Sequence, residues 1–216
     1  MSIDIIDQLL GIAPGSHLDS VRRHREVARE HTQRAYDAIF HPAETADVSL
    51  LERLAVATFI AGLNRQDGLT DHYAQLLGQT EGGAGIAAVI ATETERGATK
   101  GPYGTYPAGV LSREDLDGLH YAVSDDNRKF LGDRLAAAFD HAHLLVFRPR
   151  DASPEALGAL LTAGWSTTGI VTLSQLVAYL AFQSRLVAGL TELAENPAIA
   201  GDTPVFTQTL AAGLSA

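Results

Sequence analysis

The clearest pattern of apolar positions lies between Ile170 and Leu190. Apolar residues recur there at the three- and four-residue spacing of an α-helix: Ile170, Leu173, Leu176, Val177, Leu180, Val187 and Leu190. Val171, Tyr179 and Phe182 fall on the other sides, so the predicted helix is apolar most of the way round. Polar residues interrupt it before about 18 apolar residues have accumulated, which favours a core helix over a membrane span. We expect this helix to lie at the centre of a bundle, within one chain or shared with a neighbouring subunit.

Shorter patterns predict further helices over residues 1–16, 18–40, 50–63, 69–77, 112–119 and 130–147. Ser49 and Glu52 form a capping box at the start of one of them, and Ser153-Pro154-Glu155 is typical of a helix start. Ser112 and Ser124 are predicted to open the helices over 112–119 and 130–147. The apolar run Ile86–Ala91 fits either a helix or a buried extended segment. The segment GPYGTYPAG predicts a long loop. Because no alternating strand pattern is present, the sequence predicts an all-α fold.

Charge is interleaved along the stretch from 18 to 40. Five arginines alternate there with acidic residues, which predicts a solvated helix face. His17, His24 and His31 repeat every seven residues, whereas metal-binding histidines on a helix usually lie three or four apart. We therefore expect these three histidines at the surface.

Two segments resemble a known family. The turn Ala163-Gly164-Trp165-Ser166 with Ile170, and the helix end carrying Ala178, Tyr179, Phe182, Arg185, Leu186, Gly189 and Leu190, resemble the last helices of the alkylhydroperoxidase/carboxymuconolactone decarboxylase superfamily, most closely its peroxidase-related branch. Upstream, the helix that begins at Ser49 is similar to the family's first core helix. The resemblance spans residues 49–190. It implies an AhpD-like helical bundle (49–190), preceded by an N-terminal helical extension (1–48) and followed by a C-terminal tail (191–216).

The chain has no cysteine. The peroxidases of this family use a Cys-x-x-Cys pair followed by a histidine, and only a thiolate attacks the peroxide. With the two motifs aligned at Asn64, Gln66 and Leu69 fall at the cysteine positions and Tyr73 at the histidine. Thiol peroxidase chemistry is therefore excluded.

The lactone decarboxylase branch, which lacks the cysteine pair, points to His72. Leu69-Thr70-Asp71-His72 resembles that branch's "Gln-Leu-x-x-His" ending, with Gly68 in place of the glutamine. A histidine can act as a general acid or base on a small carboxylate or lactone, here with Tyr73 beside it in a cavity. The alternative is that His72 lies at the edge of a helix face and binds a backbone carbonyl.

Three other residues are candidates for the same site. Glu52 is either a catalytic acid or only a helix cap. Arg185 interrupts an uncharged helix, so it must be paired if buried, with a protein group or with a substrate carboxylate. Tyr179, like Tyr103, Tyr106 and Trp165, could line an apolar pocket or belong to the core. Asp140 and His143 share a helix face, but two ligands do not make a metal site, and we expect a surface pair.

Composition narrows the range of partners. The net charge of −10 and pI near 5.1 argue against nucleic acid, and the acidic N-terminus does not resemble a secretory signal, so a cytoplasmic protein is expected. No cofactor, metal or membrane partner is predicted. The protein is predicted to be a homo-oligomer. Two functions stay open: an enzyme using His72, and a non-catalytic binding or assembly protein. A link to antioxidant defence rests on the resemblance alone.

Overall fold

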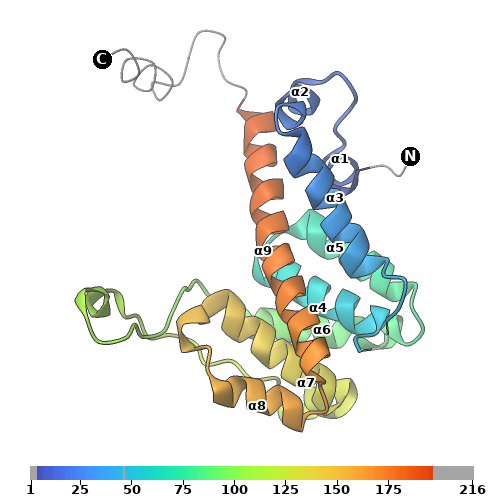
Figure 1. The fold of residues 1–216 in the computed structure, drawn as a ribbon. Coiled ribbons are helices and arrows are strands. Elements are labelled where there is room, and N and C mark those ends of the chain that lie inside the picture. The colour runs from blue at the N-terminus through green and yellow to red at the C-terminus, as the bar shows by residue number, and fades with distance from the viewer. Residues whose placement is uncertain (1–3, 46, 197–216) are drawn as a thin grey trace.

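The computed structural model describes residues 4–45 and 47–196, and these residues form an all-α fold. Over that part of the chain there are nine α-helices, two 3₁₀ helices and no strand. The helix between Thr167 and Glu195 (α9) runs the length of the molecule, with the N-terminal helices along one half and α7 and α8 beside the other (Figure 1). The all-α prediction is confirmed.

The most deeply buried helix is Leu50–Leu63 (α4), rather than the predicted Ile170–Leu190 segment. All residues of α4 from Arg53 to Ala61 are buried, because α5 (Asp67–Gly78), α6 (Gly83–Gly97), α7 and α9 surround it. The capping box predicted at Ser49 and Glu52 is present and begins α4. The core is therefore centred on α4, and α9 closes one side of it.

Helix α9 begins after Ser166, whose side chain accepts a hydrogen bond from the Gly169 N–H. It continues five residues past the predicted end at Leu190, and the rest of the predicted tail lies outside the described residues. Val171 and Phe182 on α9 are about half exposed, at 52% and 47%. Among the described residues α9 is the one helix long and apolar enough to cross a membrane, a test that core helices of soluble proteins also pass.

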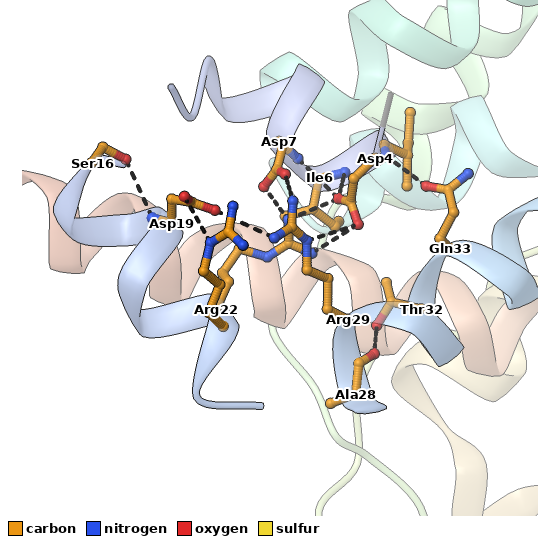
Figure 2. A network of polar contacts seen from close by, with 12 residues as sticks. Asp4, Ile6, Asp7, Ser16, Asp19, Arg22, Ala28, Arg29, Thr32 and Gln33 are labelled. Carbon is orange, nitrogen blue, oxygen red and sulfur yellow. Dashed lines mark hydrogen bonds and ion pairs between the residues drawn. The ribbon is translucent and has the colours of Figure 1, made fainter. Parts of the chain in front are cut away.

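The N-terminal extension is three helices: Ile5–Leu10 (α1), His17–Arg23 (α2) and Glu26–Phe40 (α3). The single helix predicted over 18–40 is thus broken near His24. The prediction of a solvated arginine face was wrong in part, because Arg22 is buried and binds the carboxylates of Asp4 and Asp7 (Figure 2). Arg29 joins the same carboxylates from α3. His17, His24 and His31 are exposed, as predicted.

The open alternative at Ile86–Ala91 is resolved as a helix, because this run lies inside α6. The helix predicted over 112–119 was wrong: only the short 3₁₀ helix Val110–Glu114 (η1) forms. It lies at the tip of an arm, residues 98–124, that extends away from the body (Figure 1). The arm contains the predicted GPYGTYPAG loop.

Helix Asp125–Phe147 (α7) begins at the predicted cap Ser124 and is interrupted once. Gly132 has φ +76° and ψ 157°, a conformation that residues with a side chain rarely adopt, so the helix axis changes direction there. A second 3₁₀ helix, Pro149–Asp151 (η2), leads to Pro154–Thr162 (α8). The C-terminal half of α7 thereby lies between α8 on one side and α9 on the other.

Candidate functional site

Glu52 caps helix α4 and pairs with an arginine of α7. Its carboxylate accepts hydrogen bonds from the Ser49 backbone and hydroxyl, and it forms an ion pair with Arg134 Nε at 2.6 Å. Arg134 also donates to the carbonyls of Asp47 and Gly164 and lies over the Trp165 ring. These contacts join α4 to α7 and to the turn before α9. Of the two alternatives left open for Trp165, a pocket or the core, the structure shows the core, because Trp165 is 2% exposed.

His72, Tyr73 and Tyr179 come together in one buried polar cluster. Tyr73 is fully buried, and its hydroxyl donates to Gln183 Oε1 at 2.5 Å. His72 Nε2 lies 3.1 Å from the Tyr36 hydroxyl, a side-chain partner rather than the backbone carbonyl of the alternative prediction. The Tyr179 hydroxyl and Gln183 Nε2 are buried without a hydrogen-bond partner among the described residues.

The electrostatics of this cluster favour neutral groups. Burial lowers the pKa of His72 below 6.5, and burial raises the pKa of Tyr36 to about 12. Burial also raises the pKa of Tyr73 and of Tyr179. None of these four side chains lines the cavities described below. The predicted catalytic histidine is therefore placed against Tyr36, in a packed environment.

Arg185 lies apart from the other candidates. It is exposed, and its Nη1 donates to the carbonyl of Ala181, one turn earlier on α9. It lines a cavity between α7 and α9 that is considered further below. The structure thus brings three of the five predicted site residues together and leaves Glu52 and Arg185 elsewhere.

Titratable side chains converge on a different cavity, which we call the α7–α8 cavity. Its volume is about 430 Å³, within the range of small-molecule sites. The C-terminal half of α7 supplies the largest share of the wall, and the end of the arm, the connection between α7 and α8, and α8 itself supply the rest. The lining residues are His120, Tyr121, Ala137, Asp140, His141, His143, Leu144, Arg148, Asp151, Ala156 and Ala159.

His141 is the group in this cavity whose polar atoms are unsatisfied. The residue is 6% exposed, and neither Nδ1 nor Nε2 has a hydrogen-bond partner among the described residues. Burial lowers its pKa below 6.5, so the imidazole is neutral at pH 7. A neutral imidazole offers one donor and one acceptor. A ligand in the cavity that hydrogen-bonds this ring would remove an unfavourable burial of polar atoms.

His143 has a fixed orientation. Its Nε2 donates to the Gly97 carbonyl at 2.9 Å, and its ring stacks on Tyr121 with centroids 4.5 Å apart. Burial lowers its pKa, and the hydrogen bond to Gly97 only partly opposes this. With the proton on Nε2, the lone pair is on Nδ1.

The charged groups of the α7–α8 cavity are already engaged by protein partners. Asp140 accepts from the Val123 N–H and from Arg128, each at 2.7 Å; burial nevertheless raises its pKa above 3.8. Arg148 donates from Nε to Asp151 at 2.6 Å and from Nη1 to the Gly118 carbonyl at 3.0 Å. The cavity therefore combines one unsatisfied neutral imidazole with charges that are balanced locally.

A buried carboxylate supports the Tyr121 wall. Glu93 is fully buried and accepts hydrogen bonds from the hydroxyls of Tyr121 and Ser124, each at 2.8 Å, and from Asn127 at 2.7 Å. Burial raises the pKa of Glu93, but these hydrogen bonds outweigh it and hold the pKa below 4.5. Arg96 completes the charge balance at 2.6 Å. The network fixes the end of the arm to α6 and α7.

The prediction of a surface pair at Asp140 and His143 was wrong. His143 is 1% exposed because it lies four residues after Phe139 and four before Phe147, on the face of α7 that these buried aromatic residues define. This four-residue spacing was the feature of the sequence from which the burial of His143 could have been predicted. No sequence spacing places Glu93, Tyr121 and Arg148 at the α7–α8 cavity, because they come together only through the fold of the arm. Among the described residues no three His, Asp or Glu side chains are placed to hold a metal ion.

Comparisons with known proteins give no match for this chain. No family model, no curated protein and no solved structure matches it.

Proposed function

We propose that the protein carries out acid/base chemistry on a small lactone bound in the α7–α8 cavity, with His141 as the proton-transfer group. The observation that carries the proposal is the pair of unpartnered ring nitrogens of His141 in the wall of a cavity of ligand size. A buried neutral imidazole is available as a base at pH 7 without prior loss of a proton. The substrate class is taken from the resemblance to the lactone decarboxylases. The histidine proposed to transfer the proton is His141 in place of His72.

An uncharged lactone suits the cavity better than a carboxylate. The cation in the wall, Arg148, is paired with Asp151 and a backbone carbonyl, and Asp140 adds a second acid. A ligand carboxylate would have to compete for Arg148 and lie close to these acids. A lactone carbonyl needs only one hydrogen-bond donor. In this scheme His141 removes a proton from the carbon next to the lactone carbonyl, the charge passes to the carbonyl oxygen, and the same proton or one from water is returned.

The test measures binding and proton exchange together. Five-membered lactones, with γ-butyrolactone the simplest, should raise the melting temperature, and succinate should not. In D₂O the protein should accelerate exchange of the lactone's α-hydrogens, followed by proton NMR. His141→Leu should abolish both effects, and it should melt no lower than the wild type because two unsatisfied buried atoms are removed.

Two further variants separate chemistry from folding. His141→Gln keeps a hydrogen-bonding side chain that cannot titrate, so binding should persist while exchange is lost. His31→Ala, an exposed histidine on α3, should change neither. Equal lactone shifts in the wild type and His141→Leu, or an equal response to succinate, would reject the proposal.

A second candidate function is assembly without catalysis. It is favoured by the exposed apolar side chains Val171, Phe182 and Leu193 on α9, at 52%, 47% and 40% exposure. Apolar side chains gathered on one element are typical of an interaction surface. This candidate is tested by the oligomeric state, and it does not exclude the first.

A further inference from the structure

A second cavity, which we call the α7–α9 cavity, lies between the C-terminal end of α7 and α9. Its volume is about 590 Å³, and it shares no lining residue with the α7–α8 cavity. Apolar side chains from two helices form most of its wall: Leu145, Val146 and Phe147 on α7, and Val177, Ala178 and Ala181 on α9. The segment from Lys100 to Pro102, together with Asn64, Pro149, Ser174 and Arg185, completes it.

The charge that the described residues bring to this wall is positive. Among them, Lys100 and Arg185 are the charged residues that line the cavity and no Asp or Glu does, although the chain carries a net charge of −10. Neither cation forms an ion pair with a carboxylate of the described residues, whereas Arg22, Arg29, Arg134 and Arg148 all do. Two cations without a carboxylate partner among the described residues therefore lie beside one apolar cavity.

Both cations retain hydrogen-bonding capacity. A guanidinium has five N–H donors, and among the described residues Arg185 uses one nitrogen, Nη1, on the Ala181 carbonyl at 2.7 Å. That contact holds the side chain along α9, beside the Ala181 and Ala178 positions of the wall. Asn64, whose Nδ2 lies 3.4 Å from the Ser184 hydroxyl, adds a polar amide at the same end of α9.

We propose that the α7–α9 cavity binds an amphiphilic monocarboxylate, with its carboxylate between Arg185 and Lys100 and its apolar chain against α7 and α9. Charge complementarity selects an anion, because a carboxylate accepts charge-assisted hydrogen bonds from both cations. The apolar wall selects a hydrocarbon body, since burying it is favourable in proportion to the area removed from water. The volume suits a ligand of about the size of decanoate.

A structural role for the two cations is the competing explanation. The C-terminal end of a helix carries a partial negative charge, which nearby cations stabilise, and α7 ends at this cavity. The carbonyls at that end already accept from backbone groups: Leu144 from the Arg148 N–H at 2.7 Å and Phe147 from the Tyr103 N–H at 2.6 Å. If the cations served only this helix end, their removal would lower stability and change no ligand affinity.

Isothermal titration calorimetry on the full chain tests the proposal with decanoate and with decanamide, its uncharged analogue. Decanoate should bind, and decanamide should bind at least tenfold more weakly. Arg185→Gln should weaken decanoate binding about tenfold or more and leave decanamide unchanged. Lys129→Gln removes an exposed cation on α7 outside the cavity and should leave decanoate affinity unchanged.

A reversed charge gives the sharpest outcome. Arg185→Glu with Lys100→Gln should lose decanoate binding and gain affinity for decylamine. Circular dichroism melts of each variant establish that it is folded. Equal affinity for decanoate and decanamide, or equal effects of Arg185→Gln and Lys129→Gln, would overturn the proposal. A lower melting temperature without any change in decanoate affinity would assign the cations to the helix end instead.

Discussion

At the scale of single residues, the histidines show how position in the fold decides chemistry. His17, His24 and His31 are exposed, His72 is half-buried, and His141 and His143 are buried. Burial lowers the pKa of the last three, because the charged form loses hydration. The same side chain is therefore a solvated surface group at one position and a neutral hydrogen-bonding group at another.

Replacement of His72 tests its structural position. His72→Ala leaves the Tyr36 hydroxyl, bonded to Nε2 at 3.1 Å, without that partner, so we expect a loss of about 1–3 kcal/mol in the free energy of unfolding. For a domain of this size each kcal/mol corresponds to about 2–4 °C in melting temperature. The measurement is a thermal melt of His72→Ala beside His31→Ala, which should melt like the wild type. An unchanged melt combined with loss of lactone binding would return His72 to the catalytic role.

At the scale of elements, helix starts were predictable from sequence because they depend on local groups. Ser49, Ser124 and Ser153 each accept a backbone N–H of the first turn, and each begins a helix. Ser166 caps α9 in the same way, so α9 starts at Thr167, three residues before the predicted start at Ile170. The missing helix over 112–119 reflects long-range contacts: Gly104 and Leu116 pair through their backbones, which holds the arm in a loop. Such contacts have no local signal.

The candidate site was less predictable than the helices for the same reason. His72, Tyr73 and Tyr179 were expected together and do lie in one cluster, because residues on α5 and α9 face the same core. The α7–α8 cavity depends on Glu93 holding the end of the arm and on Arg148 bonding to Gly118. Glu93 and its partner Ser124 are 31 residues apart in sequence, and Arg148 and Gly118 are 30 apart. Both separations are too long for a helical period to reveal.

The stability of the protein should respond to acid in two steps. His72, His141 and His143 have folded-state pKa values below 6.5, so the unfolded chain binds more protons and stability falls throughout the molecule as the pH drops below 6.5. Burial raises the pKa of Asp4, but hydrogen bonds from Arg22 and the Asp7 backbone bring it below 3.8. Stability from this carboxylate is present above pH 3.8 and is lost as the pH falls through the lower folded value.

Arg22 is the residue that tests the second step (Figure 2). Its side chain is 5% exposed and binds Asp4 and Asp7, whose side chains are 12% and 13% exposed and keep Arg29 as a second cation. Arg22→Met should therefore lower the free energy of unfolding by about 1–3 kcal/mol. Arg34→Met removes an exposed arginine on α3 whose partner Glu30 is also exposed, and it should change stability little. Urea unfolding at pH 7 and pH 3 measures both. The difference between wild type and Arg22→Met should shrink between pH 7 and pH 3, because the stability that Asp4 gains from Arg22 is lost as the pH falls below 3.8 through the lowered folded pKa of Asp4. A difference that is constant with pH would show that Arg22 acts by packing alone.

At the scale of the whole molecule, α9 combines two surfaces. One side packs against α4, α7 and the N-terminal helices, and the other exposes Val171, Phe182 and Leu193. The apolarity of α9 on all sides, evident in the sequence, is therefore only partly used by the core of one chain. Leu157 and Leu161 on the neighbouring α8 are also exposed, at 42% and 53%. An interface between copies of the chain would bury these side chains.

We predict a homo-oligomer in which the Ile170–Leu190 segment of α9 lies at or near the interface. Burying a large apolar side chain contributes about 1.5–3 kcal/mol, so removing Phe182 from the interface should shift the equilibrium toward monomer. Multi-angle light scattering at micromolar concentration, without detergent, should give a multiple of 22.9 kDa for the wild type and a smaller mass for Phe182→Glu. Phe130→Glu alters an exposed phenylalanine on α7, 75% exposed, and should keep the wild-type mass. A uniform 22.9 kDa species for the wild type would contradict the prediction. If Phe182→Glu and Phe130→Glu dissociate the oligomer equally, the added charge and not the loss of the α9 surface causes the dissociation. That result would place the interface elsewhere.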